Sequence, residues 1–456
     1  MRAALSAAAF ALATFVTAPV AAEPVLLISI DGLRPADVIE AERRGLKIPN
    51  LRKFVREGAY ATGVKGVLPT VTYPSHATLI TGASPARHGI FSNTTFDPGQ
   101  INAGGWYWYA SDIKLPTLWS AAAAAGKTVG NVHWPVSVGA AGVTWNLPQL
   151  WRTGHADDAK LLAAVATPGL VAELERVTGE SYAPGIDESI EGDETRGRFA
   201  VKLIETHRPD LVTAYLTALD HEQHGEGPGT AKAHAVLERI DAIVGKLVAA
   251  ELAAHPDAAI AIVSDHGFEA IGREINFFRA FIDAGLIRLD GKGAVASWEA
   301  MPWPTGGSVA VVLARKDDSA LAARVAALLA QLKADPSNGI DAIADKAQID
   351  RMGGNPEAAF FVNLASDTTS GGFGGADVPL LGKPKYKGTH GYFPSAPNLR
   401  ATFMIMGRGI PSGRSLGEID MRSIAPTLAS ILGVGLAGAE VPPLPLSGTR
   451  QEVRTR

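Results

Sequence analysis

The stretch PVLLISIDGL, residues 24–33, is an uninterrupted apolar run that ends in Asp31 and Gly32. Such a run is typical of a strand that is buried on both faces, and its last residue emerges at the carboxyl edge of a sheet. The pattern follows a helical stretch three more times, in KTVGNVHW (127–134), DLVTAYLTALD (210–220) and DAAIAIVSDHG (257–267). Strands that alternate with helices favour an α/β fold, in which a mainly parallel sheet is covered by helices on both faces.

The segment from about residue 287 to 385 breaks this alternation. It contains the helical stretch DSALAARVAALLAQLKAD (318–335) and the Gly-rich stretch TTSGGFGGADVP (368–379). We expect this segment to form a smaller lobe that is inserted beside the sheet, and one continuous domain with long loops is the alternative. From residue 398 onward, the apolar strand and helix patterns return.

The composition is that of a globular chain with enough apolar material for a large core. The chain has 456 residues, of which 46% are hydrophobic and 19% are charged, and it has no cysteine. Its formal net charge of −4 gives no electrostatic case for nucleic-acid binding. Without cysteine there is no thiolate ligand, so any transition-metal site must be built from histidine and carboxylate side chains.

The first residues, MRAALSAAAFALATFVTAPVAAEP, place one arginine before an apolar run that is rich in alanine. This order is typical of a secretory signal peptide, which we expect to cover residues 1–22 with cleavage between Ala22 and Glu23. The run is too short and too rich in alanine to favour a permanent membrane anchor. We therefore expect a periplasmic or secreted protein whose mature chain covers residues 23–456.

Three aspartates and three histidines follow the predicted strands or lie in loops: Asp31, Asp220, His224, Asp265, His266 and His390. Ligands bind at the carboxyl ends of strands in such sheets, so we expect the aspartates to converge on one edge. Asp220 and His224 are four residues apart, a spacing that places them on one face of a helical turn or lets them converge from a loop. Gly267 lets the chain turn sharply after His266.

Taken singly, the pair Asp220 and His224 and the residue His390 are more typical of ordinary loops. Asp265 and His266 are a stronger signal, because they follow a buried strand and precede a glycine, and a polar strand exit is the alternative for them. Together, the three aspartates and three histidines are enough to hold two metal ions, such as zinc, with three protein ligands each and open positions for a nucleophile and for substrate oxygens. Two ions about 4 Å apart clamp both sides of an in-line displacement at phosphorus. This hypothesis requires a nucleophile.

The stretch VLPTVTYPSHATLITG, residues 67–82, offers six hydroxyl groups around one proline: Thr70, Thr72, Tyr73, Ser75, Thr78, Thr81 and Pro74. We expect Pro74 at the first helical position, with Thr72 and Tyr73 at or just before the helix cap. The helix start then offers N–H groups to a phosphoryl oxygen. A metal-bound Thr or Ser hydroxyl is a possible nucleophile, and the alternative is that Thr72 or Ser75 only caps the helix.

Eight stretches, in the family's order, resemble the nucleotide pyrophosphatase/phosphodiesterase family of the alkaline phosphatase superfamily. They run from residue 25 to nearly the end of the chain: ISIDGLRP, PTVTYPSHATLITGASPARHGI, SNTTFDP, HWPVS, LDHEQHGEGP, VSDHGF, GTHGYFP and SIAPTLASILG. The resemblance implies an alkaline-phosphatase-like fold and a catalytic domain over residues 23–456.

The resemblance also implies a role for individual residues. Thr72, the second threonine of the PTxT[FY]P pattern, is the nucleophile and a metal ligand, and Asn93 contacts a phosphoryl oxygen. Two zinc ions are held by two sets of three side chains: Asp31, Asp265 and His266 for the ion that activates Thr72, and Asp220, His224 and His390 for the other.

Aromatic side chains near Thr72 are candidates to seat the second ester group. Tyr73 stands where the family often has Phe, and the stretch GGWYWYA adds the rings of residues 106–109, although such runs are also typical of strand cores. Val136 in HWPVS replaces the glycine of a related WPGS pattern. The substrate pocket of nucleotide-cleaving relatives therefore does not transfer in detail.

The function that the resemblance implies is an exported two-zinc hydrolase of phosphate diesters or nucleotide pyrophosphates, which works through a phospho-threonine intermediate on a small-molecule substrate. A phosphomonoesterase of the same fold is the alternative, and an inactive binding protein is a further one. The usual sulfatase nucleophile derives from cysteine, which this chain lacks. The sequence leaves open the physiological substrate and the oligomeric state.

Overall fold

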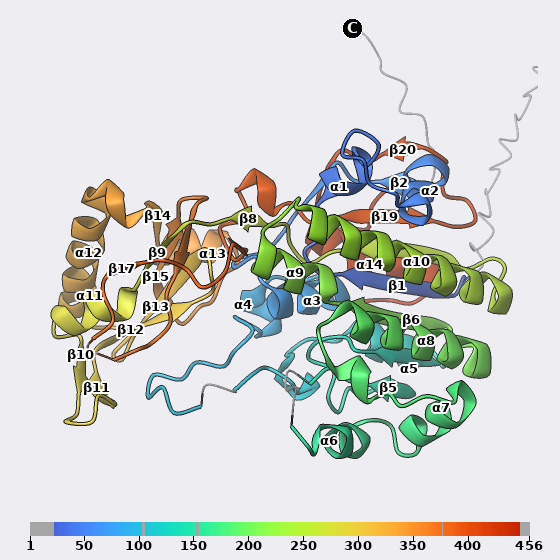
Figure 1. Cartoon of the computed structure of the whole chain (residues 1–456), viewed down its shortest axis with the longest axis horizontal. Helices are drawn as coiled ribbons and strands as arrows, with labels where there is room; N and C mark the ends of the chain where they lie inside the picture. Colours follow the sequence, from blue (N-terminus) through green and yellow to red (C-terminus); the bar gives the residue numbers. More distant parts are fainter. Residues whose placement is uncertain (1–21, 103–104, 151–154, 376, 447–456) are drawn as a thin grey trace, which may run out of the picture.

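The larger part of the molecule is built around an eight-stranded sheet in the order β20-β2-β19-β7-β1-β6-β4-β5 (Figure 1). The computed structural model describes residues 22–102, 105–150, 155–375 and 377–446. The strands from β7 to β5 are parallel, as predicted, whereas β19 is antiparallel to β7. The strands are β1 (Val25–Ile30), β2 (Ala59–Tyr60), β4 (Val129–Val132), β5 (Trp145–Leu147), β6 (Leu211–Leu216), β7 (Ala259–Val263), β19 (Phe403–Met406) and β20 (Arg414–Ser415).

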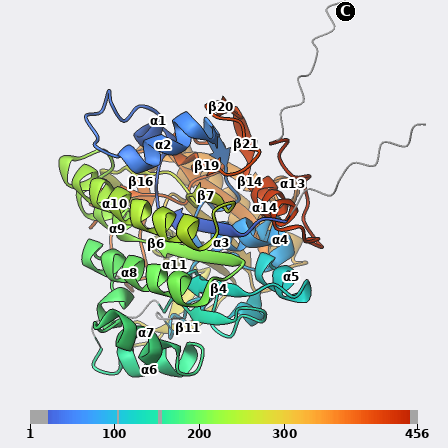
Figure 2. The same ribbon diagram turned by 90° about the vertical axis from the view of Figure 1, so that its right-hand side faces the viewer.

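Helices cover both faces of this sheet (Figure 2). On β1, Leu26 and Ile28 pack into the apolar cluster of one face, and Val25 and Leu27 pack into that of the other. Successive side chains of a strand point to opposite faces, so two covered faces require a continuous apolar run. The helices of the first face are α2 (Pro49–Glu57), α8 (Ile190–His207) and α10 (Ala231–Ala254), and those of the second are α3 (Thr72–Thr81), α5 (Leu118–Ala124) and α14 (Ile424–Leu432).

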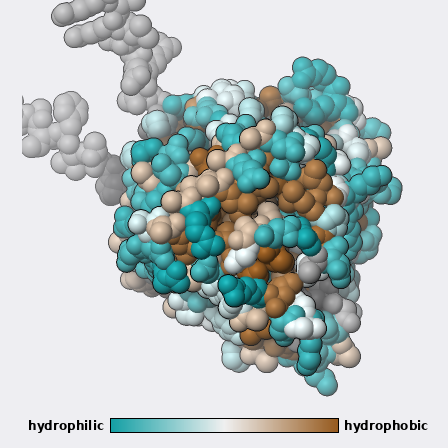
Figure 3. Space-filling model, turned by 90° about the vertical axis from the view of Figure 1, so that its left-hand side faces the viewer, coloured by the Kyte–Doolittle hydropathy of each residue, from teal (hydrophilic) through white to brown (hydrophobic). Residues whose placement is uncertain are grey.

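A second sheet lies beside the first, at the left of Figure 1. It is antiparallel and consists of β12 (Ala300–Pro304), β13 (Ser308–Leu313), β15 (Ala358–Leu364) and β14 (Ile340–Asp345). Its apolar cluster includes residues of α11 (Phe277–Asp283) and α12 (Ser319–Ala334), so the cluster begins upstream of residue 287. On the outer face of this part, hydrophobic residues gather near the centre with hydrophilic residues around them (Figure 3). That residues 287–385 form a separate lobe stays a prediction.

Short ladders join the two parts of the molecule near the end of β7. Gly388 and Thr389 of β18 pair with Ala270 and Glu269 of β8. The hydroxyl of Thr70 donates to the carbonyl of Tyr392 at 2.8 Å.

The remaining short strands are β3 (Gly63–Lys65), β8 (Glu269–Ala270), β9 (Arg273–Ile275), β10 (Ile287–Leu289), β11 (Val295–Trp298), β16 (Thr368–Ser370), β17 (Leu381–Gly382), β18 (Gly388–Thr389) and β21 (Glu418–Asp420).

The remaining described α-helices are α1 (Pro35–Ile39), α4 (Pro85–His88), α6 (Asp158–Val165), α7 (Leu170–Thr178), α13 (Lys346–Arg351) and α9 (Ala218–Glu226), of which α9 belongs to the site. No described helix combines the length and the apolar character that crossing a bilayer would need. The predicted signal peptide lies, except for its last residue, outside the described residues.

Helix α3, which lies within the hydroxyl-rich stretch of residues 67–82, begins earlier than predicted. Thr72 and Tyr73 are the first two residues of α3, and Val71 is its cap, so the prediction that Pro74 opens the helix is wrong. Proline fits the third position because the first N–H groups of a helix have no intrahelical partner. No side chain caps α3, so neither Thr72 nor Ser75 is a capping residue here.

Candidate active site

A cavity of about 340 Å³ opens at the carboxyl edge of the parallel strands. Asp31 follows β1 directly, and Asp220 follows β6 in the first turn of α9. The residues that line the cavity come from segments far apart in the sequence: Asp31, Thr72, Tyr73, Asn93, Trp106, Gln149, Glu188, Tyr215, Asp220, His221, His224, Gly225, Tyr386 and His390. The structure thus brings most of the candidate residues together at one place.

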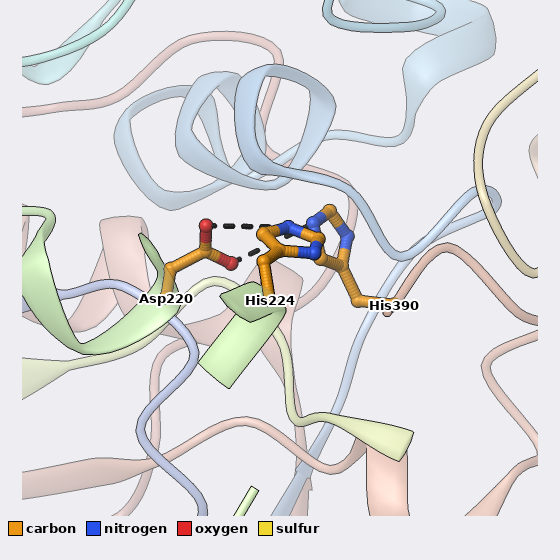
Figure 4. A group of neighbouring side chains, drawn as sticks. All are labelled: Asp220, His224 and His390. Carbon is orange, nitrogen blue, oxygen red and sulfur yellow. Dashed lines mark ion pairs between the residues drawn. The ribbon is translucent and has the colours of Figure 1, made fainter. Parts of the chain in front are cut away.

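One group of candidate ligands consists of Asp220, His224 and His390 (Figure 4). The ligand atoms of these three residues lie within 4.8 Å of one another. Nε2 of His224 is 3.4 Å from Oδ2 of Asp220, and Nε2 of His390 is 3.6 Å from Oδ1 of the same carboxylate. This group has the composition that the family resemblance implies for the second ion.

A second group consists of Asp31, Asp220 and His266, whose ligand atoms also lie within 4.8 Å of one another. Nε2 of His266 is 3.3 Å from Oδ1 of Asp31 and 3.1 Å from Oδ2 of Asp265. Asp220 therefore belongs to both groups and joins them into one cluster. The imidazoles of His266 and His390 stack with 3.7 Å between their centroids. The division of six ligands between two ions stays a prediction.

The three candidate histidine ligands are oriented by the main chain. Their Nδ1 atoms lie within hydrogen-bond distance of backbone carbonyl oxygens: His266 on Gly267 (3.0 Å), His224 on Gly388 (2.9 Å) and His390 on Thr70 (3.3 Å). An Nδ1–H that donates to a carbonyl leaves Nε2 unprotonated and free to bind a metal. In each case it is Nε2 that faces the carboxylates.

The charges of the cluster also fit a bound cation. Oδ1 of Asp31, Oδ1 of Asp220 and Oδ2 of Asp265 are buried and have no hydrogen-bond partner. Burial and the neighbouring carboxylates of Asp220 and Asp265 raise the pKa of Asp31 well above its ordinary value. Burial and the nearby histidines lower the pKa of His390 well below its ordinary value, which favours the neutral, metal-binding form. Asp and neutral His are ligands that zinc accepts.

Thr72 lies at the edge of this cluster. Its Oγ1 is 3.5 Å from Nε2 of His266, and the side chain lines the cavity. Asn93 lies beside it, because its Oδ1 accepts a hydrogen bond from the N–H of Tyr73 at 2.8 Å. Thr70 and Ser75 do not line the cavity.

A family model described as type I phosphodiesterase / nucleotide pyrophosphatase matches residues 25–392. The chain belongs to this family. Human ectonucleotide pyrophosphatase/phosphodiesterase family member 1 is 26% identical over 260 residues, which are 54% of this chain and 24% of that protein. The bis(5'-adenosyl)-triphosphatase ENPP4 of Bos taurus is 27% identical over 254 residues, 55% of this chain and 48% of that protein. The chain thus spans a quarter to a half of these relatives.

Solved structures of murine ectonucleotide pyrophosphatase/phosphodiesterase 5 share the fold. They superpose with a TM-score of 0.63 at 17% identity, over 91% of this chain and 96% of theirs. One of them is of an inactive threonine-to-alanine variant in complex with AMP. The likeness confirms the predicted alkaline-phosphatase-like fold of this family member.

Aromatic side chains, Tyr73 among them, form part of the cavity wall. That Tyr73 seats the second ester group stays a prediction. The rings of Tyr73 and Trp106 meet edge to face with 5.4 Å between centroids, and Tyr386 also lines the cavity. Tyr109 of the same aromatic stretch is 54% exposed and does not line it. Val136 lies outside the cavity lining, with a φ of 56° in the left-handed region that glycine favours.

Sequence reasoning missed several side chains of this site. Tyr215, on β6, donates its hydroxyl hydrogen to the carboxylate of Asp31. His76 lies one helical turn after Thr72, and its Nδ1 is 2.8 Å from the carbonyl oxygen of Thr72. His221, the neighbour of Asp220 in the sequence, lines the cavity with Glu188, and 3.7 Å separates Nδ1 of His221 from Oε2 of Glu188. Gln149 is a further lining residue whose sequence context carries no signal.

Proposed function

We propose that this family member is an exported two-zinc hydrolase that cleaves phosphate diesters or nucleotide pyrophosphates. The relatives are named as pyrophosphatases, phosphodiesterases or a triphosphatase, which supports this class of reaction. The signal-like first 22 residues and the prefix "ecto" in the name of the human relative support export to the periplasm or the medium. The observation that carries the proposal is the Thr72 hydroxyl beside the buried histidine and carboxylate cluster.

In this proposal Asp31, Asp265 and His266, together with Thr72, hold one zinc ion. The other ion is held by the group Asp220, His224 and His390. Bound zinc supplies Lewis acidity, which favours the deprotonated hydroxyl nucleophile and stabilises charge on the phosphoryl oxygens. The three carboxylate oxygens without a hydrogen-bond partner support this assignment, because a buried carboxylate stays ionised only with a cation nearby and otherwise takes up a proton.

Thr72 acts as the nucleophile. Its Oγ1 forms a bond to phosphorus, and the bond to the leaving ester oxygen breaks, which gives a phospho-threonine that water then hydrolyses. Asn93 assists, because its Oδ1 is already engaged by the N–H of Tyr73 and its amide NH₂ is left to donate to a phosphoryl oxygen. The inactive threonine-to-alanine variant of the murine relative supports an essential threonine, and its AMP supports a nucleotide-sized ligand.

The cavity favours a diester over a monoester. A phosphate monoester presents additional unesterified oxygens, which require cationic partners such as Arg or Lys. Among the described residues that line the cavity there is neither Arg nor Lys. The rings of Tyr73, Trp106 and Tyr386 instead offer an apolar surface for a second ester group.

The proposal is tested by comparing kcat/KM for a diester and a monoester that carry the same aryl leaving group. We expect the zinc-loaded chain to prefer the diester by at least about tenfold, a difference of about 1.4 kcal/mol in transition-state stabilisation. A preference for the monoester would favour the phosphomonoesterase alternative. No turnover of either substrate would favour an inactive binding protein.

A further inference from the structure

Arg196, on α8, is a buried arginine that does not line the cavity. It is paired with Asp193 one turn earlier, and its Nε donates to Oδ1 of Asp193 at 3.1 Å. The two side chains are 1% and 0% exposed. Removal of two charges from water is costly, so a pair at this depth depends on further hydrogen bonds to each partner.

Asp193 makes these further bonds to the start of α9. Its Oδ1 accepts from the N–H of Thr217 and its Oδ2 from the N–H of Ala218, both at 2.9 Å. Such N–H groups have no partner within their own helix. Thr217 is the cap residue, yet its side chain does not cap α9, and its hydroxyl accepts instead from Nη2 of Arg196 at 2.6 Å. The start of α9 is therefore held by α8.

The position of this helix start decides where two candidate ligands point. Asp220 and His224 lie on the first two turns of α9 and face the cavity together. Each residue of a helix is rotated by about 100° from the previous one. A shift of the α9 start by a single residue would therefore turn both side chains away from His390.

Arg196 also binds the segment that precedes Glu188, a residue that lines the cavity. Its Nη1 donates to the carbonyl oxygens of Gly185 and Asp187 at 2.7 and 2.6 Å. The next residue, Glu188, lines the cavity opposite His221. One guanidinium thus bonds to three segments through Nε, Nη1 and Nη2, which the single ammonium group of lysine does not reproduce.

We propose that Arg196 and Asp193 form a positioning pair that aligns Asp220 and His224 with His390 for binding of one metal ion. Neither residue lines the cavity, so the pair acts through the start of α9. The inference rests on the proposed function, since it assigns to the pair a part in holding one of the two zinc ions.

The test measures the two stepwise zinc affinities of the full chain by competition with a chromophoric chelator. We expect Arg196→Lys and Asp193→Asn to weaken zinc binding about 10- to 100-fold at the site that includes His224 and His390, as for other residues that orient metal ligands, and to weaken the other site less, because only Asp220 belongs to both groups. Excess zinc should then restore the activity of Arg196→Lys. The matched control is Arg198→Lys on the same helix, whose 41% exposed side chain pairs with Glu180 and should give wild-type affinities.

Zinc affinities equal to wild type in both variants would overturn the inference. An equal loss at both sites, together with a lower thermal midpoint, would also overturn it, because it would indicate a general structural role. Should Arg196→Lys fail to fold, Thr217→Val removes one acceptor of the guanidinium, and weaker binding at one site is again the supporting result. A wild-type chain that binds no zinc would contradict the proposed function itself, which is a different outcome from unchanged variants.

Discussion

Oγ1 of Thr72 lies 3.5 Å from Nε2 of His266, although 194 positions separate the two residues in the sequence. The contact joins the first turn of α3 to the end of β7. Ser75 belongs to the same helical turn, but its hydroxyl is buried without a hydrogen-bond partner and does not line the cavity. Separate substitutions of Thr72 and Ser75 can therefore distinguish a hydroxyl in the cavity from one outside it.

Replacement of Thr72 by Ala should abolish turnover of an aryl phosphodiester, because the proposed nucleophile is lost. We expect kcat/KM to fall by at least about 10³-fold, while the zinc content stays near two per chain. The control is Ser75→Ala, which removes a hydroxyl outside the cavity and should keep activity within a few-fold of wild type. Substantial turnover by Thr72→Ala would rule out this residue as the nucleophile.

His224→Ala should lower the zinc content of the purified chain from two toward one, because the variant lacks one of three ligands of a site. Elemental analysis measures the result. His221→Ala is the matched control, because this neighbour lines the cavity but belongs to neither ligand group and should leave the zinc content unchanged. An unchanged zinc content in both variants would count against the ligand assignment.

Trp106→Ala should raise KM for diesters with a large aromatic ester group more than for methyl esters of the same leaving group. The reason is that the ring packs against Tyr73 on the cavity wall and offers apolar contact to such a group. An effect of roughly 0.5–1.5 kcal/mol, or two- to tenfold in KM, is expected for one aromatic contact. Tyr109→Ala, on the exposed side of the same stretch, should change neither KM. Equal effects on both esters would argue against a substrate-binding role.

The free energy of unfolding should fall with decreasing pH, because His88 is buried in its neutral form. Burial lowers the pKa of His88 from 6.5 to about 3. The folded chain keeps the ring neutral, while the unfolded chain binds a proton below about pH 6.5. The contribution of the neutral ring to the free energy of unfolding is therefore complete above pH 6.5. It is lost as the pH falls toward 3, by about 1.4 kcal/mol per pH unit.

Urea unfolding at pH 6.5 and pH 5 measures this loss in wild type and in His88→Gln. The wild type should lose roughly 2 kcal/mol more over this interval than the variant, whatever the absolute stability of the variant is. Identical pH dependence in both proteins would show that His88 does not titrate as its burial predicts. The neutral ring fits its contacts, because Nδ1 accepts from the N–H of Ile90 and Nε2 lies 3.1 Å from Oγ1 of Thr78.

Much of the parallel sheet could be predicted because burial on both faces leaves a direct mark in the sequence. The run that becomes β1 is apolar except for Ser29, and Asp31 follows it where the strand ends. The strands before Asp220 and Asp265 carry the same mark. The antiparallel direction of β19 was not predictable, because an apolar run looks the same in either direction.

The side chains that support the site were not predictable, because their contacts depend on strand register and helix packing, which leave no local mark in the sequence. Tyr215 lies within β6, where an aromatic residue is typical of a strand core, and its bond to Asp31 depends on the register of β1 and β6. Arg196 lies in an ordinary polar helix sequence, and its burial follows only from the packing of α8. The start of α3 was misplaced because proline is allowed at several positions of a first turn.

The three candidate histidine ligands each donate to a backbone carbonyl oxygen, so the groups that orient them belong to the main chain and not to other side chains. A carbonyl oxygen is present whatever side chain a residue carries, so no substitution at Gly267, Gly388 or Thr70 deletes the group that orients the imidazole. Only a change in the path of the backbone would do so. A side chain at Gly267 or Gly388 would force such a change, because an added Cβ would lie 1.9 Å from the carbonyl oxygen of Asn398 and 2.6 Å from that of Gln223. The orientation of His266 and His224 therefore depends on two residues that have no side chain of their own.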